Sequence, residues 1–160
     1  MNFDWKCELK KPSYDSSFCH PLKDFWTTKC TRCPDALDQL EEMAQDKRFS
    51  NVQFSSIVLD ECDGARNIIE EPDEKPRWEN IDHYHMDIDY KETAKQILGF
   101  NQVPFYVVLN EDGMIVQKGS KKQINFDSVP GVIQKLQMEE KKMELQSLNE
   151  ERVFCMDDDF

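Results

Sequence analysis

The sequence has little that points to a membrane or to a nucleic acid. In 160 residues, no apolar run approaches the roughly 18 residues that a membrane-spanning helix requires. Basic residues are also scarce, because 20 lysines and arginines stand against 32 aspartates and glutamates, and the net charge is −12. Nucleic acids and anionic membrane surfaces recruit proteins through lysine and arginine. The composition therefore argues against both kinds of partner.

The N-terminus lacks the order of a secretion signal, in which basic residues precede an apolar stretch. Residues 1–6 read Met-Asn-Phe-Asp-Trp-Lys instead, so we expect a soluble, cytoplasmic protein. The apolar fraction of 39% is low and the charged fraction of 32% is high. A chain of this length and composition predicts one compact domain with solvated extensions.

Six cysteines are present, but only one pair has a spacing that carries meaning by itself. Cysteines of cytosolic proteins usually stay reduced unless they are catalytic or bind a metal. Cys30 and Cys33 lie three positions apart at the head of an amphipathic helical pattern, close enough to form a small disulfide and open it again. The other cysteines are scattered and are expected to be ordinary thiols: Cys7, Cys19, Cys62 and Cys155.

The apolar pattern predicts alternating strands and helices. Strands are expected over residues 22–26, 51–59, 81–88, 104–109 and 114–118. Helices are expected over residues 31–47, 65–70, 90–98 (ended by Gly99) and from 127 or 128 through 136. The first half predicts parallel strands joined by crossover helices, and the turn at residues 110–113 adds an antiparallel hairpin. The fold class is therefore α/β, with a central mixed sheet covered by helices on both faces.

These features resemble the thioredoxin superfamily. Asp24-Phe25-Trp26 followed by Cys30-Thr31-Arg32-Cys33 looks like the active-site stretch of that family. Val103-Pro104 matches its cis-proline loop, and residues 110–119 match its closing hairpin with a terminal glycine. The resemblance implies a thioredoxin-like fold with the cysteine loop at the carboxyl end of a strand, where sites of open α/β sheets lie.

The resemblance covers roughly residues 22–137, which we predict to be the thioredoxin-like domain. Residues 1–21 are expected to form an irregular N-terminal arm. An insertion at about residues 60–88 is similar to the helix-plus-strand insertion of nucleoredoxin-like, tryparedoxin-like and peroxiredoxin-like members. Residues 138–160 are expected to form a long C-terminal helix that ends in an acidic tail.

The chemistry of the family assigns a role to each of the motif residues. A thiolate attacks a disulfide, so Cys30 must lose its proton near neutral pH, and Cys33 then resolves the mixed disulfide. A helix N-terminus and the charges of Lys29 and Arg32 favour that thiolate, so we expect the pKa of Cys30 to lie below the pKa of a free cysteine. Asp24 matches the buried acid of thioredoxins that assists the second thiol. The alternative for Asp24 is an exposed carboxylate at the end of a strand.

A partner protein is expected to lie against the residues around the cysteines. The predicted substrate-binding residues are Trp26, Lys29, Arg32, Val103 and Pro104. The sequence departs from the family pattern at Lys29, where a tryptophan usually precedes the first cysteine, and at Thr31-Arg32, where Gly-Pro is common. These departures leave the reduction potential and the partner reductase open. No obvious peroxidatic cysteine motif is present, which argues against a peroxidase.

A zinc site is the alternative use of the cysteines. Structural zinc sites take four nitrogen or sulfur ligands, often from two Cys-x-x-Cys pairs, and this sequence has one such pair. Cys19-His20 and the pair His83 and His85 are the remaining candidates. We favour two half-exposed strand histidines over a metal site, and we expect neither a metal nor another cofactor.

Two function classes follow from the sequence. The first is a dithiol oxidoreductase that acts on protein disulfides and is served by a thiol reductase system. The second is a thioredoxin-like subunit of a large ciliary or cytoskeletal assembly, comparable to the thioredoxin-like light chains of ciliary dyneins. The helix-forming stretch at residues 138–148 has a thin apolar stripe, which suits either a solvated charged helix or docking onto a partner.

Overall fold

The computed structural model describes residues 20–70, 76–110, 112–130 and 142. The chain divides into two compact units, residues 1–125 and 126–160. In the second unit the structure describes a 3-10 helix, η2 (Phe126–Ser128), and a helical Lys142. Residues 129 and 130 are helical as well, whereas residues 131–136 of the predicted last helix lie outside the described residues, as do residues 138–141 and 143–160 of the predicted extension. Within the described ranges, no helix is both long enough and apolar enough to cross a membrane.

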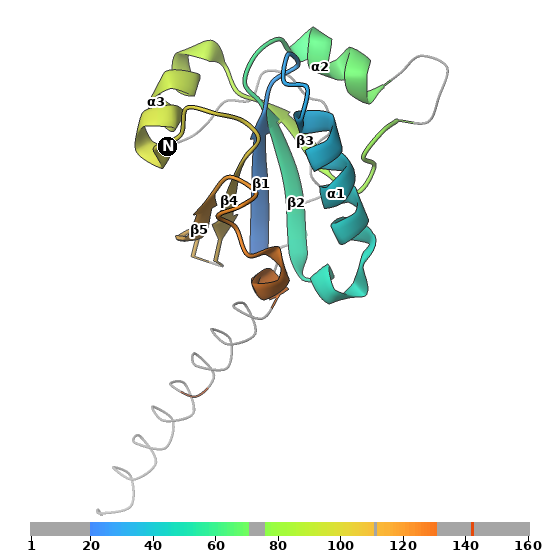
Figure 1. Cartoon of the computed structure of the whole chain (residues 1–160), viewed down its shortest axis with the longest axis vertical. Helices are drawn as coiled ribbons and strands as arrows, with labels where there is room; N and C mark the ends of the chain where they lie inside the picture. The colour runs from blue at the N-terminus through green and yellow to red at the C-terminus, as the bar shows by residue number, and fades with distance from the viewer. Residues whose placement is uncertain (1–19, 71–75, 111, 131–141, 143–160) are drawn as a thin grey trace, which may run out of the picture. The chain divides into compact units, whose positions relative to one another are not determined.

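Five strands form one mixed sheet in the order β3-β2-β1-β4-β5 (Figure 1). The strands are β1 (His20–Trp26), β2 (Val52–Val58), β3 (Asp82–His85), β4 (Phe105–Leu109) and β5 (Ile115–Gly119). β1, β2 and β3 run parallel, whereas β4 pairs antiparallel with β1 and with β5. The predicted parallel half and antiparallel hairpin are therefore confirmed.

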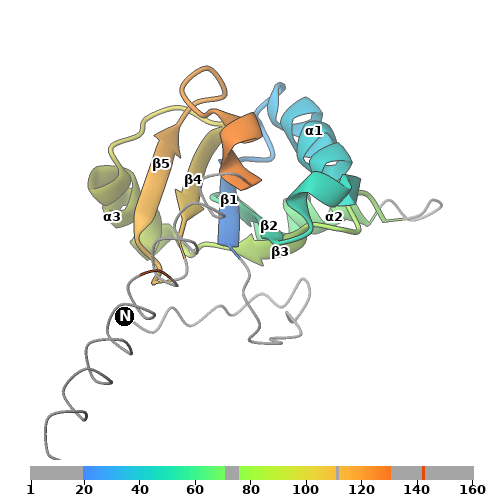
Figure 2. The ribbon, with the colours of Figure 1, turned by 90° about the horizontal axis from the view of Figure 1, so that it is seen from below.

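The helices cover both faces of this sheet, as predicted. They are α1 (Cys33–Gln45), α2 (Cys62–Ile69) and α3 (Ile88–Leu98), and a 3-10 turn, η1 (Lys47–Phe49), follows α1. Figure 2 shows α1 and α3 on opposite sides of the sheet. The predicted helix-plus-strand insertion is present as α2 and β3. α3 ends at Gly99, which adopts a left-handed φ of 74°, a conformation that glycine reaches at little cost.

Most element boundaries differ from the predictions by one to three residues, and local contacts account for the differences at β1 and β3. β1 begins at His20 rather than at residue 22, because His20 and Pro21, which were assigned to the N-terminal arm, pair with β2. β3 stops at His85 rather than continuing through residue 88, because the side chain of Asp87 accepts a hydrogen bond from the backbone N–H of Asp89 and begins α3. α1 begins two residues later than expected, at Cys33.

The strands bury alternate side chains on the two faces of the sheet, since successive residues of a strand point to opposite sides. On the face covered by α3, one buried cluster comprises Phe25, Ile57, Leu59, Met86, Phe100, Phe105 and Val107. Trp26 and Tyr106 belong to the opposite face and are nearly inaccessible, at 1% exposure each. β1 therefore lies in the centre of the sheet between two buried layers, with its carboxyl end at the cysteine loop.

Candidate active site

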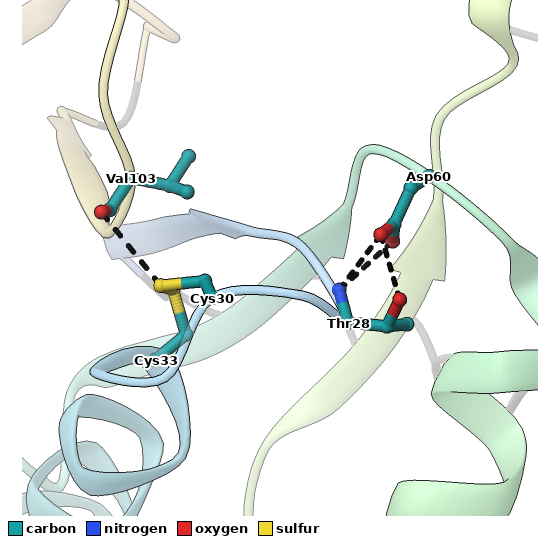
Figure 3. The surroundings of a disulfide bond; sticks show 5 residues. All are labelled: Thr28, Cys30, Cys33, Asp60 and Val103. Carbon is teal, nitrogen blue, oxygen red and sulfur yellow. Dashed lines mark hydrogen bonds between the residues drawn. A yellow bond between two sulfur atoms is a disulfide. The ribbon is translucent and has the colours of Figure 1, made fainter.

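Cys30 and Cys33 form a disulfide just beyond the carboxyl end of β1 (Figure 3). Their Cα atoms lie 5.4 Å apart, a separation typical of disulfides. Cys30 is partly exposed, whereas Cys33 is the first residue of α1 and is 0% exposed. The two sulfur atoms therefore differ in access, and only that of Cys30 is open to an incoming partner.

A tight turn separates the two cysteines. The backbone N–H of Cys30 donates to the carbonyl oxygen of Thr27 at 3.1 Å, and the N–H of Cys33 donates to the carbonyl oxygen of Cys30 at 3.3 Å. These bonds place Thr31 and Arg32 in a turn. Cys30 therefore lies three positions before the first residue of the helix, which is Cys33. Pro34 follows inside the first helical turn, where a missing backbone N–H costs nothing.

The loop between α3 and β4 brings a distant segment against the disulfide. The peptide bond between Val103 and Pro104 is cis, as the family resemblance implied. The carbonyl oxygen of Val103 lies 3.7 Å from Sγ of Cys30, although the two residues are 73 positions apart (Figure 3). Both residues of the loop are partly exposed. The site therefore presents a partly exposed sulfur beside an accessible backbone edge.

A carboxylate from the loop that follows β2 holds the other side of the cysteine loop. Asp60 accepts two hydrogen bonds from the backbone N–H of Thr28, at 3.0 and 2.9 Å, and a third from the Thr28 hydroxyl at 2.7 Å (Figure 3). Sequence reasoning missed this contact. The signal was available, because parallel β1 and β2 end at the paired residues Trp26 and Val58. Thr28 and Asp60 each follow two positions after these strand ends, so they lie close together.

Asp24 is a fully buried acid in the centre of the sheet, at 0% exposure. The alternative of an exposed strand-end carboxylate is therefore wrong. Neither of its carboxylate oxygens has a hydrogen-bond partner among the described residues. Burial without compensation disfavours the charged form, and it raises the pKa of Asp24 well above its ordinary value of 3.8.

Asp24 lies on the side of the sheet that α1 covers. Its direct partner across the antiparallel pair is Tyr106, and Tyr106 lines the same cleft as Ala36 and Gln39 of α1. Burial, and secondarily the charge of Asp24, raise the pKa of the Tyr106 hydroxyl. Asp24 thus lies beneath the helix that begins with Cys33.

Comparison with solved structures identifies this architecture. The thioredoxin domain of a thiol-disulfide oxidoreductase from Bacteroides vulgatus is 16% identical, with a TM-score of 0.55, and the match covers 74% of this chain and 79% of that one. The chain has a thioredoxin-like fold. A thiol-disulfide oxidoreductase from Bacteroides fragilis is 22% identical, with a TM-score of 0.52 and coverage of 74% and 81%.

A third similar structure is the N-terminal domain of PilB from Neisseria gonorrhoeae, which is 20% identical, with a TM-score of 0.53 and coverage of 72% of this chain and 76% of that one. No family model matches the sequence, and no curated protein matches it either. At these identities the similarity concerns the fold, which confirms the resemblance at that level. The nucleoredoxin-like or tryparedoxin-like subtype stays a prediction.

Within this thioredoxin-like fold, the predicted substrate-binding residues divide into two groups. Lys29 and Arg32 are exposed beside the cysteines, and Val103 and Pro104 adjoin them. Trp26 does not share this surface, because its side chain is 1% exposed and packs edge-on against Trp78 at 6.2 Å between ring centroids. The structure places Trp26 in the core beneath the loop, where it cannot touch a partner directly.

Among the candidate metal ligands outside the Cys30–Cys33 pair, the structure describes the side chains of His83 and His85. His83 is buried rather than half-exposed, and its two ring nitrogens lie 2.6 Å from the Ser56 hydroxyl and 3.1 Å from the carbonyl oxygen of Trp78. His85 is partly buried, as expected. In the described ranges no group of three or more potential metal ligands comes together.

One of the four cysteines expected to be ordinary thiols departs from that expectation. Cys62, the first residue of α2, is disulfide-bonded, so the prediction for this position was wrong. Spacing alone gave no signal, because Cys62 has no cysteine nearby in the sequence. The other three lie outside the described residues.

Proposed function

We propose that the protein is a thiol–disulfide oxidoreductase that acts on disulfides of other proteins through the Cys30 and Cys33 couple. The observation that carries this proposal is the disulfide itself, placed at the end of β1 with Sγ of Cys30 3.7 Å from the carbonyl oxygen of Val103. A closed pair with one partly exposed and one buried sulfur suits an exchange in two successive steps.

In the reducing direction the protein starts with both cysteines as thiols. The Cys30 thiolate attacks one sulfur of the partner's disulfide, so that a mixed disulfide forms and the partner's second sulfur leaves as a thiolate. Cys33 then loses its proton and attacks Cys30, which releases the partner's remaining sulfur. The partner disulfide gains two electrons and two protons, and the Cys30–Cys33 pair loses them. A dithiol of a separate thiol reductase system returns the pair to its starting state.

The charge around Cys30 and the burial of Cys33 give the two cysteines different roles in the exchange. Cys30 has the exposed cations Lys29 and Arg32 on its two sides, and nearby positive charge stabilises a thiolate. Cys33 is buried and needs a proton acceptor when it becomes the nucleophile. Asp24 is the acceptor we propose, because its raised pKa makes the carboxylate a stronger base than an ordinary aspartate.

The test is reduction of insulin by the purified protein with a small dithiol as electron donor. We expect the wild-type protein to reduce insulin and the Cys30→Ser variant to do so no faster than the donor alone. Met114→Leu, at an exposed position before β5, is the control substitution, and we expect it to reduce insulin at the wild-type rate. Equal, negligible rates for wild type and Cys30→Ser would remove the proposed activity.

Docking through residues 138–160 into a ciliary or cytoskeletal assembly is the second candidate, and it rests on the sequence pattern. Deletion of these residues is expected to abolish co-purification with a large complex while insulin reduction persists. Unchanged co-purification would refute the docking role.

The cytoplasm is the proposed location, with the cilium or the cytoskeleton as the site of any assembly. The disulfide-bonded state of Cys62 provides a test of this location, because cytosolic thiol pools keep structural cysteines reduced. Rapid alkylation of native cells, followed by mass analysis, distinguishes a Cys62 that is bonded in cells, as it is in the structure, from one that a cytosolic thiol pool keeps reduced, and the reduced form is the result that a cytoplasmic location requires. A Cys62 that is oxidised in cells would favour an oxidising compartment and overturn this part of the proposal.

A further inference from the structure

A cleft of about 860 Å³ opens beside the disulfide. Its walls come from the start of α1, from the loop that carries Val103 and Pro104, and from residues 120–123 after β5. Arg32 stands between the two cysteines and lines the cleft, and Cys30 adjoins it through its contact with Val103. A partner whose disulfide meets Cys30 therefore extends its neighbouring residues into this cleft.

The cleft carries the opposite charge to the protein as a whole. Its charged lining residues are the cations Arg32, Lys121 and Lys122, opposed by the single carboxylate of Asp35. The whole chain, by contrast, has 32 acidic residues against 20 basic ones. The local positive balance beside the disulfide is thus a feature of the site.

These cations also lack the carboxylate partners that several other described cations have. Arg48, Arg66, Arg77 and Lys95 each form an ion pair with a carboxylate. Arg32, Lys121 and Lys122 are exposed and form neither an ion pair nor a side-chain hydrogen bond within the described residues. Three solvated, unneutralised cations at one cleft are available to an anionic partner.

We propose that the cleft selects polypeptide partners whose disulfide is flanked by acidic residues. This inference rests on the proposed oxidoreductase function and names its substrate class. An extended acidic segment would lie along the Val103–Pro104 loop, with carboxylates facing Arg32, Lys121 and Lys122. A polypeptide fits better than a small molecule, because pockets for small ligands enclose most of the ligand surface, whereas these three cations are exposed at an open rim.

The test compares two peptides that contain the same intramolecular disulfide and differ only at two flanking positions, which are glutamate in one and glutamine in the other. We expect the reduced protein to open the glutamate peptide about five- to tenfold faster at low ionic strength, because rim charges act mainly on association. The ratio should approach one at 1 M salt, where the Debye length is only about 3 Å.

A pair of double variants assigns the preference to the cleft. Lys121→Gln/Lys122→Gln removes two cleft charges and is expected to bring the ratio of the two peptide rates down to about two or less. Lys47→Gln/Lys91→Gln removes the same charge from residues that do not line the cleft and is expected to keep the ratio of the wild-type protein. Loss of the preference in both double variants would overturn the assignment to the cleft.

The remaining outcomes distinguish a failure of the acidic selectivity from a failure of the proposed oxidoreductase function. If both peptides are reduced at the same rate, the acidic selectivity is wrong and the oxidoreductase function stands. If neither peptide nor insulin is reduced above background, the oxidoreductase function itself fails. Glutathione disulfide is the third substrate. If Lys121→Gln/Lys122→Gln lowers the rate of its reduction more than that of the glutamate peptide, the substrate class is a small anionic disulfide and not an acidic polypeptide.

Discussion

Nε2 of His85 lies 2.7 Å from the backbone carbonyl oxygen of Asp60. This contact ties the end of β3 to the residue whose carboxylate holds Thr28. The cysteine loop is therefore braced through three consecutive strands of the sheet, β1, β2 and β3. We infer that the geometry of the disulfide depends on this brace. The effect is indirect, because the hydrogen bonds of His85 and Asp60 given above involve no sulfur atom.

Asp60→Asn tests the brace. Asparagine retains one oxygen but replaces the other acceptor with a donor, so at least one of the three bonds to Thr28 is lost. A hydrogen bond to a charged group contributes about 1.5–3 kcal/mol, and we expect a loss of unfolding free energy of about 2 kcal/mol in urea titrations. We also expect a change in the redox equilibrium of the Cys30–Cys33 pair against glutathione.

Asp112→Asn is the matched control for this change, because it removes the same charge at an exposed turn position. It should leave both the unfolding free energy and the redox equilibrium as they are in the wild-type protein. If Asp60→Asn behaves like Asp112→Asn, the brace has no role in positioning the loop.

Cys33→Ser is expected to arrest the exchange at its midpoint. Cys30 can still attack a partner, but the second nucleophile is absent, so the mixed disulfide accumulates. Intact-mass analysis after mixing with a disulfide peptide should show one peptide chain attached to most of the protein. The adduct should disappear when a dithiol is added. A Cys30→Ser/Cys33→Ser protein that forms the same adduct would show that neither thiol of the pair is the attacking group.

Asp24→Asn is expected to make the protein more stable at neutral pH. The unfolded state loses the Asp24 proton near pH 3.8, whereas the folded state keeps it to a higher pH because burial raises the pKa. The folded state then binds more protons, so the unfolding free energy falls as pH rises from about 3.8 through the raised pKa, and the loss persists above it. Urea titrations should show a gain for Asp24→Asn at pH 7 that vanishes near pH 3.

The same variant should slow the second step of the exchange. Positioned acids and bases contribute about 10²–10⁴ to a rate, and we expect resolution of the mixed disulfide to fall by about 10² or more. Attack by Cys30 should be nearly unchanged, which a single-turnover measurement resolves as normal formation and slow decay of the adduct. A variant that is more stable but resolves at the wild-type rate would leave Asp24 with a structural role alone.

Gly99→Ala tests the end of α3. A residue with a side chain in the left-handed region costs roughly 1–2 kcal/mol, so we expect a loss of unfolding free energy of about 1 kcal/mol. Gln96→Ala, at an exposed position in the same helix, should be close to neutral or slightly stabilising because alanine favours helices. Equal midpoints for the two variants in urea would show that the φ of 74° at Gly99 carries no cost.

Patterns between near neighbours allowed much of the fold to be predicted. The apolar run of β2, the helix stop at Gly99 and the turn before β5 each depend on residues within a few positions of one another in the chain. Their boundaries were less predictable, since Asp87 ends β3 early through one capping bond and the Cys30 carbonyl delays α1. Such bonds depend on a single side chain or turn and leave no periodic signal.

The sequence by itself determined the spacing of Cys30 and Cys33 and the strand that leads to them, because both are local. Only the tertiary structure decided that Val103 faces Cys30, that Asp60 holds Thr28 and that Trp26 is buried below the loop. It also gathered the cations Arg32, Lys121 and Lys122 at one cleft. These relationships join residues far apart in the chain, and they depend on strand order and register, which no short stretch of sequence encodes.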